Sequence, residues 1–295
     1  MKKLPIFFVF LFSLLVGNAQ KDKVYSSLDE ALKNPSQVFI LYLNNQKLTE
    51  LPEIISRFSN LTTLNLAGNR LSAIPENIVS LKQLTAVDLS SNRFNAIPET
   101  ITKLVNLTEL DLSSNNLYFI PGTITKLVNL KKLFLNNNKL ASFPDFMAKM
   151  VSLTEIYLYG NLLPSVPESI SKLSNLTEIG LGGNMLTSLP ASMGNMTNLK
   201  YLALSYNKFT TLPDCITQLT NLVVLDLNGN KIVSLPPGIG NLTELEEFYL
   251  ELNKLTTLPE TLTQLAALTT INIKGNPSIK LSPAVKKFIE DKKLK

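Results

Sequence analysis

The chain has 295 residues, of which 45% are hydrophobic, and its 28 lysines and arginines against 23 acidic residues give a net charge of +5. It has no histidine and one cysteine, which excludes an internal disulfide and any site that needs histidine. Six lysines lie in residues 280–295, so the excess charge belongs largely to the C-terminal tail. We therefore expect no basic working face and no nucleic-acid partner.

Residues 1–19 have the organisation of an export signal. The basic pair Lys2 and Lys3 precedes an apolar run over residues 4–16, and small residues lead to a cleavage site near Ala19. The apolar run is too short to span a bilayer comfortably, so we expect cleavage and no stable membrane anchor. The expected destination is the periplasm, the cell surface or the medium.

Residues 20–37 predict an N-terminal helical cap. Ser27 and Glu30 have the spacing of a capping box, and Asn34-Pro35 ends the short helix that they begin. We expect this helix to cover the apolar edge of the first repeat.

Residues 38–279 repeat a unit of 23 residues about eleven times, with the pattern LxxLxLxxNxLxxLPxxIxxLxx. The alternating LxL predicts a short strand, and one strand per unit in a constant sense predicts a parallel stack. The proline that follows predicts a short helical or 3₁₀ segment on the outer side. One unit alone cannot bury enough apolar surface to fold, so neighbouring units must stack.

The asparagine of the unit lies where the chain leaves the strand and turns inward. Its amide both donates and accepts, so we expect it to satisfy backbone groups of its own and the adjacent coil. It recurs without insertion at these positions: Asn69, Asn92, Asn115, Asn138, Asn161, Asn184, Asn207, Asn230, Asn253 and Asn276.

The pattern resembles leucine-rich repeats of the 23-residue LPxxIxxL type, found in Ras-suppressor-like adaptors and plant resistance-like proteins. With the export signal, the chain is similar to an exported bacterial member. The resemblance implies an α/β repeat solenoid: a curved horseshoe with a concave parallel β-sheet, a convex side of short helical or 3₁₀ segments and helical end caps. It also implies partner binding on the concave face and no catalytic residue. The chain departs from the pattern in the first coil, where Gln46 replaces the asparagine.

Aromatic residues gather on the expected concave face, because residues 23 apart lie on neighbouring strands about 4.8 Å apart. Exposed aromatic side chains on either side of glycines, which carry no side chain, would form the walls of a depression. We predict that this depression is the ligand site. Its members are Phe134, Tyr157, Tyr159, Gly180, Gly182, Tyr201 and Tyr206. The alternative is that the aromatics only fill a pleated surface.

Asp88 and Asp111 are expected side by side in the central column of this face, with Glu109 close by. Two carboxylates at about 5 Å would suit a retaining glycosidase, which is the enzyme alternative. An open sheet flanked by serines should give neither a walled cleft nor a raised pKa, so we expect a secondary contact to a basic side chain or a cation. Glu109, Lys132 and Glu155 alternate in sign and should neutralise one another.

Residues 280–295 predict a C-terminal helical cap. Ser282-Pro283 should begin a helix that seals the last coil, and two sealed ends favour a monomer. Cys215 lies in a column of small polar residues, so we expect its thiol partly exposed on the convex side.

The leading interpretation is an exported, non-enzymatic protein that binds a protein or a surface glycan through its concave face, with no cofactor and no metal. The first alternative is an intracellular signalling adaptor of the Ras-suppressor-like kind. The second is a glycoside hydrolase that acts through the acidic pair.

Overall fold

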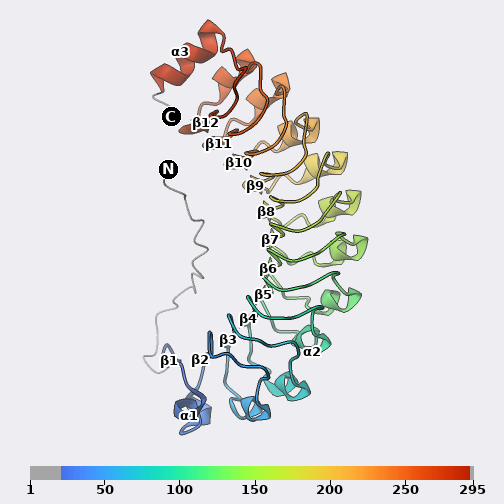
Figure 1. Ribbon diagram of the computed structural model, residues 1–295, viewed down its shortest axis with the longest axis vertical. Helices are drawn as coiled ribbons and strands as arrows, with labels where there is room; N and C mark the ends of the chain where they lie inside the picture. The colour runs from blue at the N-terminus through green and yellow to red at the C-terminus, as the bar shows by residue number, and fades with distance from the viewer. Residues whose placement is uncertain (1–20, 293–295) are drawn as a thin grey trace.

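The computed structural model describes residues 21–292 as an arc of stacked coils, with one parallel sheet on the inner side and short helical segments on the outer side (Figure 1). The strands are β1 (Val24–Tyr25), β2 (Ile40–Tyr42), β3 (Thr63–Asn65), β4 (Ala86–Asp88), β5 (Glu109–Asp111), β6 (Lys132–Phe134), β7 (Glu155–Tyr157), β8 (Glu178–Gly180), β9 (Tyr201–Ala203), β10 (Val224–Asp226), β11 (Glu247–Tyr249) and β12 (Thr270–Asn272). The predicted solenoid is confirmed.

Short helical segments form the outer side. Of the α-helices, α2 (Glu99–Thr102) lies on this side, whereas α1 (Leu28–Ala31) and α3 (Pro283–Asp291) lie at the two ends of the arc (Figure 1). The 3₁₀ segments are η1 (Pro35–Gln37), η2 (Glu53–Arg57), η3 (Glu76–Ser80), η4 (Gly122–Lys126), η5 (Asp145–Lys149), η6 (Glu168–Lys172), η7 (Ala191–Asn195), η8 (Asp214–Gln218), η9 (Pro237–Asn241) and η10 (Glu260–Gln264). Each segment from η2 to η10, and α2, starts directly after the proline of its unit, as the repeat predicts.

The 23-residue period of the sequence equals the offset between paired residues on neighbouring strands. Each strand from β2 to β11 pairs in parallel with the strand 23 residues further on, so that Asp88 faces Asp111 and Phe134 faces Tyr157. The same offset places Asp111 opposite Phe134. Residues of one repeat column therefore form continuous rows along the concave face.

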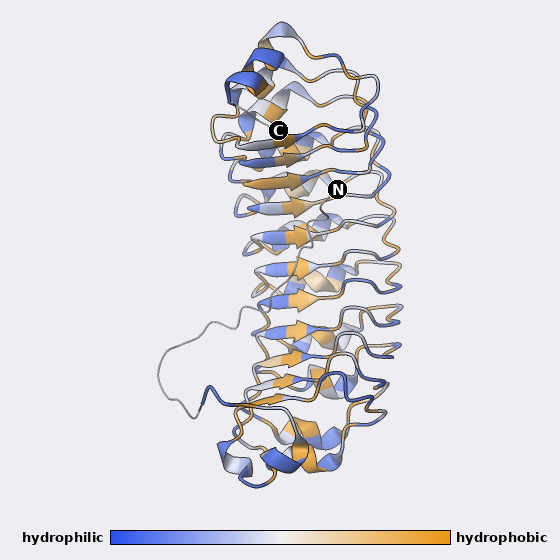
Figure 2. Cartoon of the chain, turned by 60° about the vertical axis from the view of Figure 1, so that its left-hand side comes forward, coloured by the Kyte–Doolittle hydropathy of each residue, from blue (hydrophilic) through white to orange (hydrophobic). Residues whose placement is uncertain are grey.

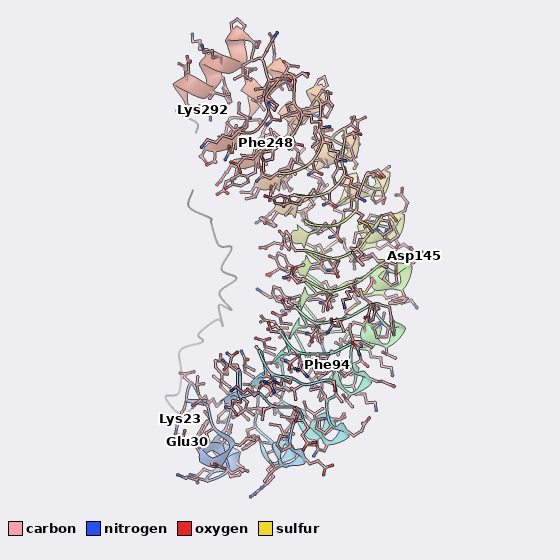
Figure 3. The ribbon with its side chains drawn as sticks, in the orientation of Figure 1. Lys23, Glu30, Phe94, Asp145, Phe248 and Lys292 are labelled. Atoms are coloured by element: carbon pink, nitrogen blue, oxygen red, sulfur yellow. The ribbon has the colours of Figure 1, made fainter. Side chains whose placement is uncertain are left out.

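The core fills the space between the sheet and the outer segments. In the unit that starts at Leu107, all seven expected core residues are buried: Leu107, Leu110, Leu112, Leu117, Ile120, Ile124 and Leu127. Larger side chains replace leucine at several places, and Phe94 and Phe248 are fully buried there (Figure 3). Each coil covers the apolar side of its neighbour, which is why a single unit would not be stable.

The repeated asparagines form a ladder in the interior. Asn115 is 7% exposed; its Nδ2 donates to the carbonyls of Leu89 and Leu112, and its Oδ1 accepts from the backbone N–H of Phe94. All ten asparagines make these three kinds of contact, which join each coil to the one before it. The predicted role of this column is confirmed.

The N-terminal end differs from its prediction. Ser27 precedes α1 but makes no side-chain capping bond, so the predicted capping box is wrong. Residues Val24–Tyr25 instead form β1, which pairs with β2 and extends the sheet by one strand. The replacement of asparagine by Gln46 in the first coil has a structural reason. The Nε2 of Gln46 donates to the carbonyl of Ser26 and joins the N-terminal segment to the first coil.

The C-terminal end follows its prediction. The Oγ of Ser282 accepts from the N–H of Val285 at 3.4 Å and caps α3, which begins with Pro283. Val285 is buried, and Phe288 packs against the core. This helix therefore covers the last coil.

Cys215 corrects a further expectation. It lies in η8 and is only 6% exposed, so the prediction of a partly exposed thiol is wrong. The outer segments stack closely, and Gly194 of η7 leaves no side chain between its backbone and the carbonyl of Cys215. Burial raises the pKa of the thiol.

Within residues 21–292 no helix has the length and apolar character that crossing a bilayer requires. The predicted export signal lies outside the described residues.

Candidate functional site

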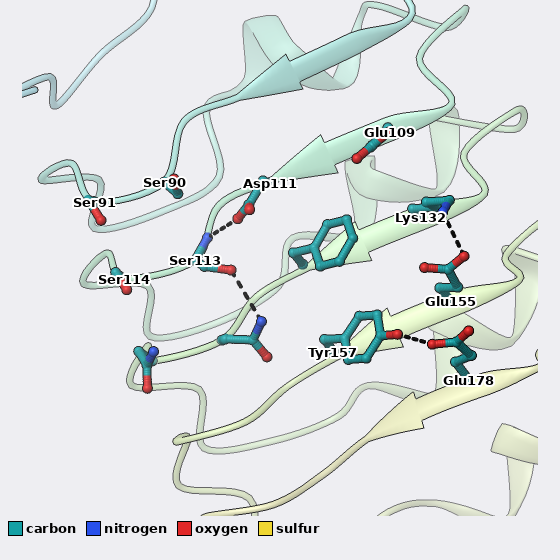
Figure 4. Close-up of a pocket in the computed structure, with 13 residues that line it drawn as sticks. Ser90, Ser91, Glu109, Asp111, Ser113, Ser114, Lys132, Glu155, Tyr157 and Glu178 are labelled. Carbon is teal, nitrogen blue, oxygen red and sulfur yellow. Dashed lines mark hydrogen bonds and ion pairs between the residues drawn. The ribbon is translucent and has the colours of Figure 1, made fainter. Parts of the chain in front are cut away.

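A hollow of about 400 Å³ lies on the concave face over β5 to β8 (Figure 4). It is lined by acidic, aromatic and small polar side chains: Ser90, Ser91, Glu109, Asp111, Ser113, Ser114, Lys132, Phe134, Asn136, Asn137, Glu155, Tyr157 and Glu178. We call this site the acidic hollow. Three of the residues predicted for the ligand site, Asp111, Phe134 and Tyr157, line it.

The floor of the acidic hollow is the central column of the sheet. Asp111, Phe134 and Tyr157 lie in register on β5, β6 and β7. The rings of Phe134 and Tyr157 are parallel within 3°, with centroids 5.2 Å apart. Both are well packed, at 7% and 1% exposed, so the prediction of exposed aromatics is wrong for this pair. Neighbouring strands hold the two rings too close for either to project freely.

One wall comes from the strand starts. Lys132 Nζ pairs with Glu155 Oε1 at 2.7 Å, and the Tyr157 hydroxyl donates to Glu178. Glu109 lies at the same column position as Lys132 on the neighbouring strand. Four carboxylates (Glu109, Asp111, Glu155 and Glu178) thus line the hollow against one ammonium group. The ion pair of Lys132 with Glu155 agrees with part of the expected alternating ladder, but Glu178 extends the column and leaves the hollow acidic.

The other wall comes from the turns that follow the strands. The N–H of Ser113 donates to Asp111 Oδ1 at 2.7 Å, and Asn136 Nδ2 donates to Ser113 Oγ at 3.4 Å. Asn136 Oδ1 in turn accepts from the N–H of Tyr159. These bonds fix the turn and present hydroxyl and amide groups along the rim (Figure 4).

Burial perturbs the carboxyl groups of the acidic hollow and its edge. Burial, together with the neighbouring charge of Asp88, raises the pKa of Asp111 to about 7, although hydrogen bonds from Ser113 oppose the shift. Burial likewise raises the pKa of Asp88 and that of Glu109. The expectation that this sheet would not raise a carboxyl pKa is therefore wrong. The two aspartates are 8% and 9% exposed, and each accepts a hydrogen bond from the N–H of the serine two residues further on.

The rest of the aromatic patch does not line the acidic hollow. The ring of Tyr159 lies over Gly180 and Gly182, where a Cβ atom at either glycine would collide with it. The Tyr159 and Tyr201 hydroxyls are 2.9 Å apart. The predicted depression is therefore filled by Tyr159, and the glycines make room for its ring instead of for a ligand.

Tyr206 and Asp88 also lie apart. Tyr206 is 62% exposed in the turn after β9, and Asp88 is the neighbour of Asp111 on β4 without lining the hollow. Sequence reasoning missed Glu178, Asn136 and Asn137 as members of one site. The signal was present, because Asn136 and Asn137 follow Phe134 in its own coil, and Glu178 lies beside the central column in the coil after that of Tyr157. Within the described residues, no cluster of three metal-ligating side chains is present.

Comparison with known proteins identifies the repeat. The leucine-rich repeat model matches overlapping segments from residue 36 to 186, and the model of a leucine-rich repeat region matches residues 184–290. The chain belongs to the leucine-rich repeat family. Among curated proteins, none matches the chain by sequence.

Solved leucine-rich repeat structures share the fold. A TDR receptor is 29% identical with a TM-score of 0.74, over 90% of this chain and 47% of that one. The Arabidopsis receptor kinase HAESA, solved with the peptide hormone IDA and the co-receptor SERK1, is 29% identical with a TM-score of 0.68, over 79% and 41%. An internalin (InlF) from Listeria monocytogenes is 19% identical with a TM-score of 0.66, over 79% and 70%. This chain spans less than half the length of the two receptor chains.

Replacing Asp111 by asparagine should remove a pH dependence of stability. A carboxyl group whose pKa is higher in the folded state stabilises the fold at low pH, and this contribution is lost as the pH rises from about 4 to about 7. The shift corresponds to up to about 4 kcal/mol. Chemical unfolding should therefore give equal stability for wild type and Asp111→Asn at pH 4, and a more stable variant at pH 8. Parallel stability curves at all pH values would contradict the raised pKa.

Proposed function

We propose that this leucine-rich repeat protein is an exported, non-enzymatic binding protein that takes an extended protein segment on its concave face. A basic side chain of that segment enters the acidic hollow. The observation that carries this proposal is the combination of four carboxylates and one lysine around the stacked rings of Phe134 and Tyr157.

The chemistry of the hollow suits a guanidinium or ammonium group. Carboxylates give charge-assisted hydrogen bonds, and aromatic rings tolerate a cation beside them. Glu109 and Asp111 lie on β5, across β6 from Glu155, and Lys132 forms its ion pair with Glu155, so a cation bound at Glu109 and Asp111 does not have to break that pair. A bound cation would also favour ionised Asp111 and release its proton near neutral pH.

A protein segment fits better than a surface glycan. Sugar rings generally need an accessible aromatic face, whereas Phe134 and Tyr157 stack on each other and are 7% and 1% exposed. The concave rows run along the whole sheet, which suits an extended chain that spans several strands. The structural neighbours support this choice, since HAESA was solved in complex with the peptide hormone IDA.

A binding role also fits the acidic pair better than hydrolysis does. Asp111 has a pKa suited to proton transfer, but residues 21–292 place no second layer over the concave side of the sheet that would wall in a cleft (Figure 1). Asp88, its expected partner in catalysis, does not line the hollow. We therefore assign these carboxylates to recognition and charge.

Removing charge from the hollow should weaken partner capture. The double variant Glu109→Gln with Asp111→Asn keeps the side-chain shapes and should lower affinity by more than about tenfold, because a buried charge-assisted bond contributes about 1.5–3 kcal/mol. The measurement is capture from surface and extracellular extracts, followed by titration of the captured protein. The control is Glu246→Gln with Glu260→Gln, two exposed glutamates outside the hollow, which should bind like the wild type. Equal binding by both variants would refute the site.

Export is tested separately by the mature N-terminus. Mass spectrometry of the chain expressed in a bacterial host with a signal peptidase should find Gln20 as the first residue, because small residues precede it. A retained Met1 on the folded protein would contradict export and favour the intracellular adaptor. That result would leave the acidic hollow and its binding test unaffected.

A further inference from the structure

One flank of the arc carries a row of cations. The residue after each ladder asparagine, or after Gln46 in the first coil, lies in the loop that leaves the strand, and in seven of the eleven coils it is basic. We call these residues the cationic row: Lys47, Arg70, Arg93, Lys139, Lys208, Lys231 and Lys254. All seven are exposed. From Arg70 onward, each backbone N–H donates to a carbonyl of the preceding coil, which fixes the row from coil to coil.

The cationic row lacks counter-charges. From the residue before each ladder position to the proline that follows it, the eleven loops hold a single acidic residue, Glu50. Across residues 21–292, none of the seven cations takes part in an ion pair. Acidic residues concentrate elsewhere: in the acidic hollow and at the starts of the outer segments, as at Glu76 and Glu168. The flank is therefore positive at the first three coils and from Lys208 to Lys254, with Lys139 as the one basic residue of the row between these two stretches.

The same loops expose large apolar side chains. They are Tyr118, Phe119, Leu162, Met185, Tyr206, Val233 and Leu252, each between 36% and 62% exposed. Leu162 and Met185 take two places within the row itself. Lys139 Nζ lies 5.4 Å from the ring centroid of Tyr118, so cations and apolar groups share one surface.

Two of these apolar residues are held in a strained backbone. Tyr206 and Leu252 have φ of 54° and 55°, a left-handed conformation that bulky residues rarely adopt. Other coils place glycine at this position, as at Gly160 and Gly229. A strained, exposed apolar side chain is more easily explained by a contact outside the fold than by the fold itself.

The shape of the flank favours a flat partner. The arc curves in the plane of Figure 1, and the loops that leave the strands lie along the edge to which the arrowheads point in Figure 2. A flat surface laid against this side touches all coils together, whereas a linear polymer would have to follow the curve. The concave face points in another direction and stays open.

We propose that this flank docks on an anionic lipid surface. The cationic row contacts the headgroup phosphates, and the exposed aromatic and aliphatic side chains enter the headgroup layer. The contact is peripheral and reversible. It is independent of the partner proposed for the acidic hollow, which remains accessible to a second ligand when the flank is occupied.

Vesicle sedimentation tests the electrostatic part with the full chain. Wild type should bind vesicles of phosphatidylcholine with phosphatidylglycerol and not vesicles of phosphatidylcholine alone. The variant Lys208→Glu, Lys231→Glu, Lys254→Glu should lose more than about tenfold in affinity. The matched control, Lys126→Glu, Lys149→Glu, Lys172→Glu, makes the same charge change at exposed convex positions and should lose less than about threefold. No binding by wild type, or equal loss in both variants, would overturn the proposal.

A second pair of variants tests the apolar part. Leu162→Ser with Met185→Ser should weaken vesicle binding by more than about threefold, since two exposed apolar contacts are lost. Val105→Ser with Val128→Ser, exposed in the loops that enter the strands, should have no effect. If the first pair also has no effect while soluble heparin binds the chain as tightly as the vesicles do, the flank recognises a soluble polyanion and the lipid proposal is wrong.

Discussion

The asparagine ladder is the constraint on which the rest of the structure depends. Each amide bonds to the carbonyls of two coils and accepts an N–H from the earlier one, so no coil can shift without leaving buried polar groups unpaired. Because the period is 23 throughout, every other column of the repeat is held in register by the same contacts. The ladder also requires a left-handed residue before it, with φ between 52° and 74° from Gly68 to Gly275.

A fixed register allows each column to acquire its own chemistry. The concave columns gather carboxylates and aromatic rings, and the column after the asparagine gathers cations. The charge of the whole chain hides this division, since basic and acidic residues nearly balance once the tail is set aside. In the two proposals made above, each of these differently charged surfaces binds its own partner.

The fold could be predicted almost completely from the sequence, because a periodic chain repeats the same local evidence in every coil. Columns 23 apart also predicted that Asp88 and Asp111 would be neighbours, and that Phe134 and Tyr157 would be. The candidate site could be predicted only in part. A column of the repeat predicts which residues are neighbours on the sheet. It does not predict how deeply a side chain is buried or how an aromatic ring is oriented.

Three residues show this limit. The ring of Tyr159 fills the space over Gly180 and Gly182. From the sequence alone, these glycines indicate an empty space, because they carry no side chains. Asp111 is 9% exposed, and its raised pKa comes chiefly from this burial, which only the assembled arc produces. Cys215 is 6% exposed where its outer segment stacks on that of the preceding coil, and this burial depends on how closely those segments stack. In each case the deciding quantity is a three-dimensional packing distance that no single repeat encodes.

Carboxyl footprinting of the complex tests the central claim, that the acidic hollow is the place where a protein partner binds. The free chain and its complex with the captured partner are labelled with a carbodiimide and an amine, and the modified residues are located by mass spectrometry. The account predicts that the partner protects Glu109, Glu155 and Glu178, which line the hollow, and leaves Glu246 and Glu260 unchanged. Unchanged labelling of the three lining glutamates in a saturated complex would contradict it.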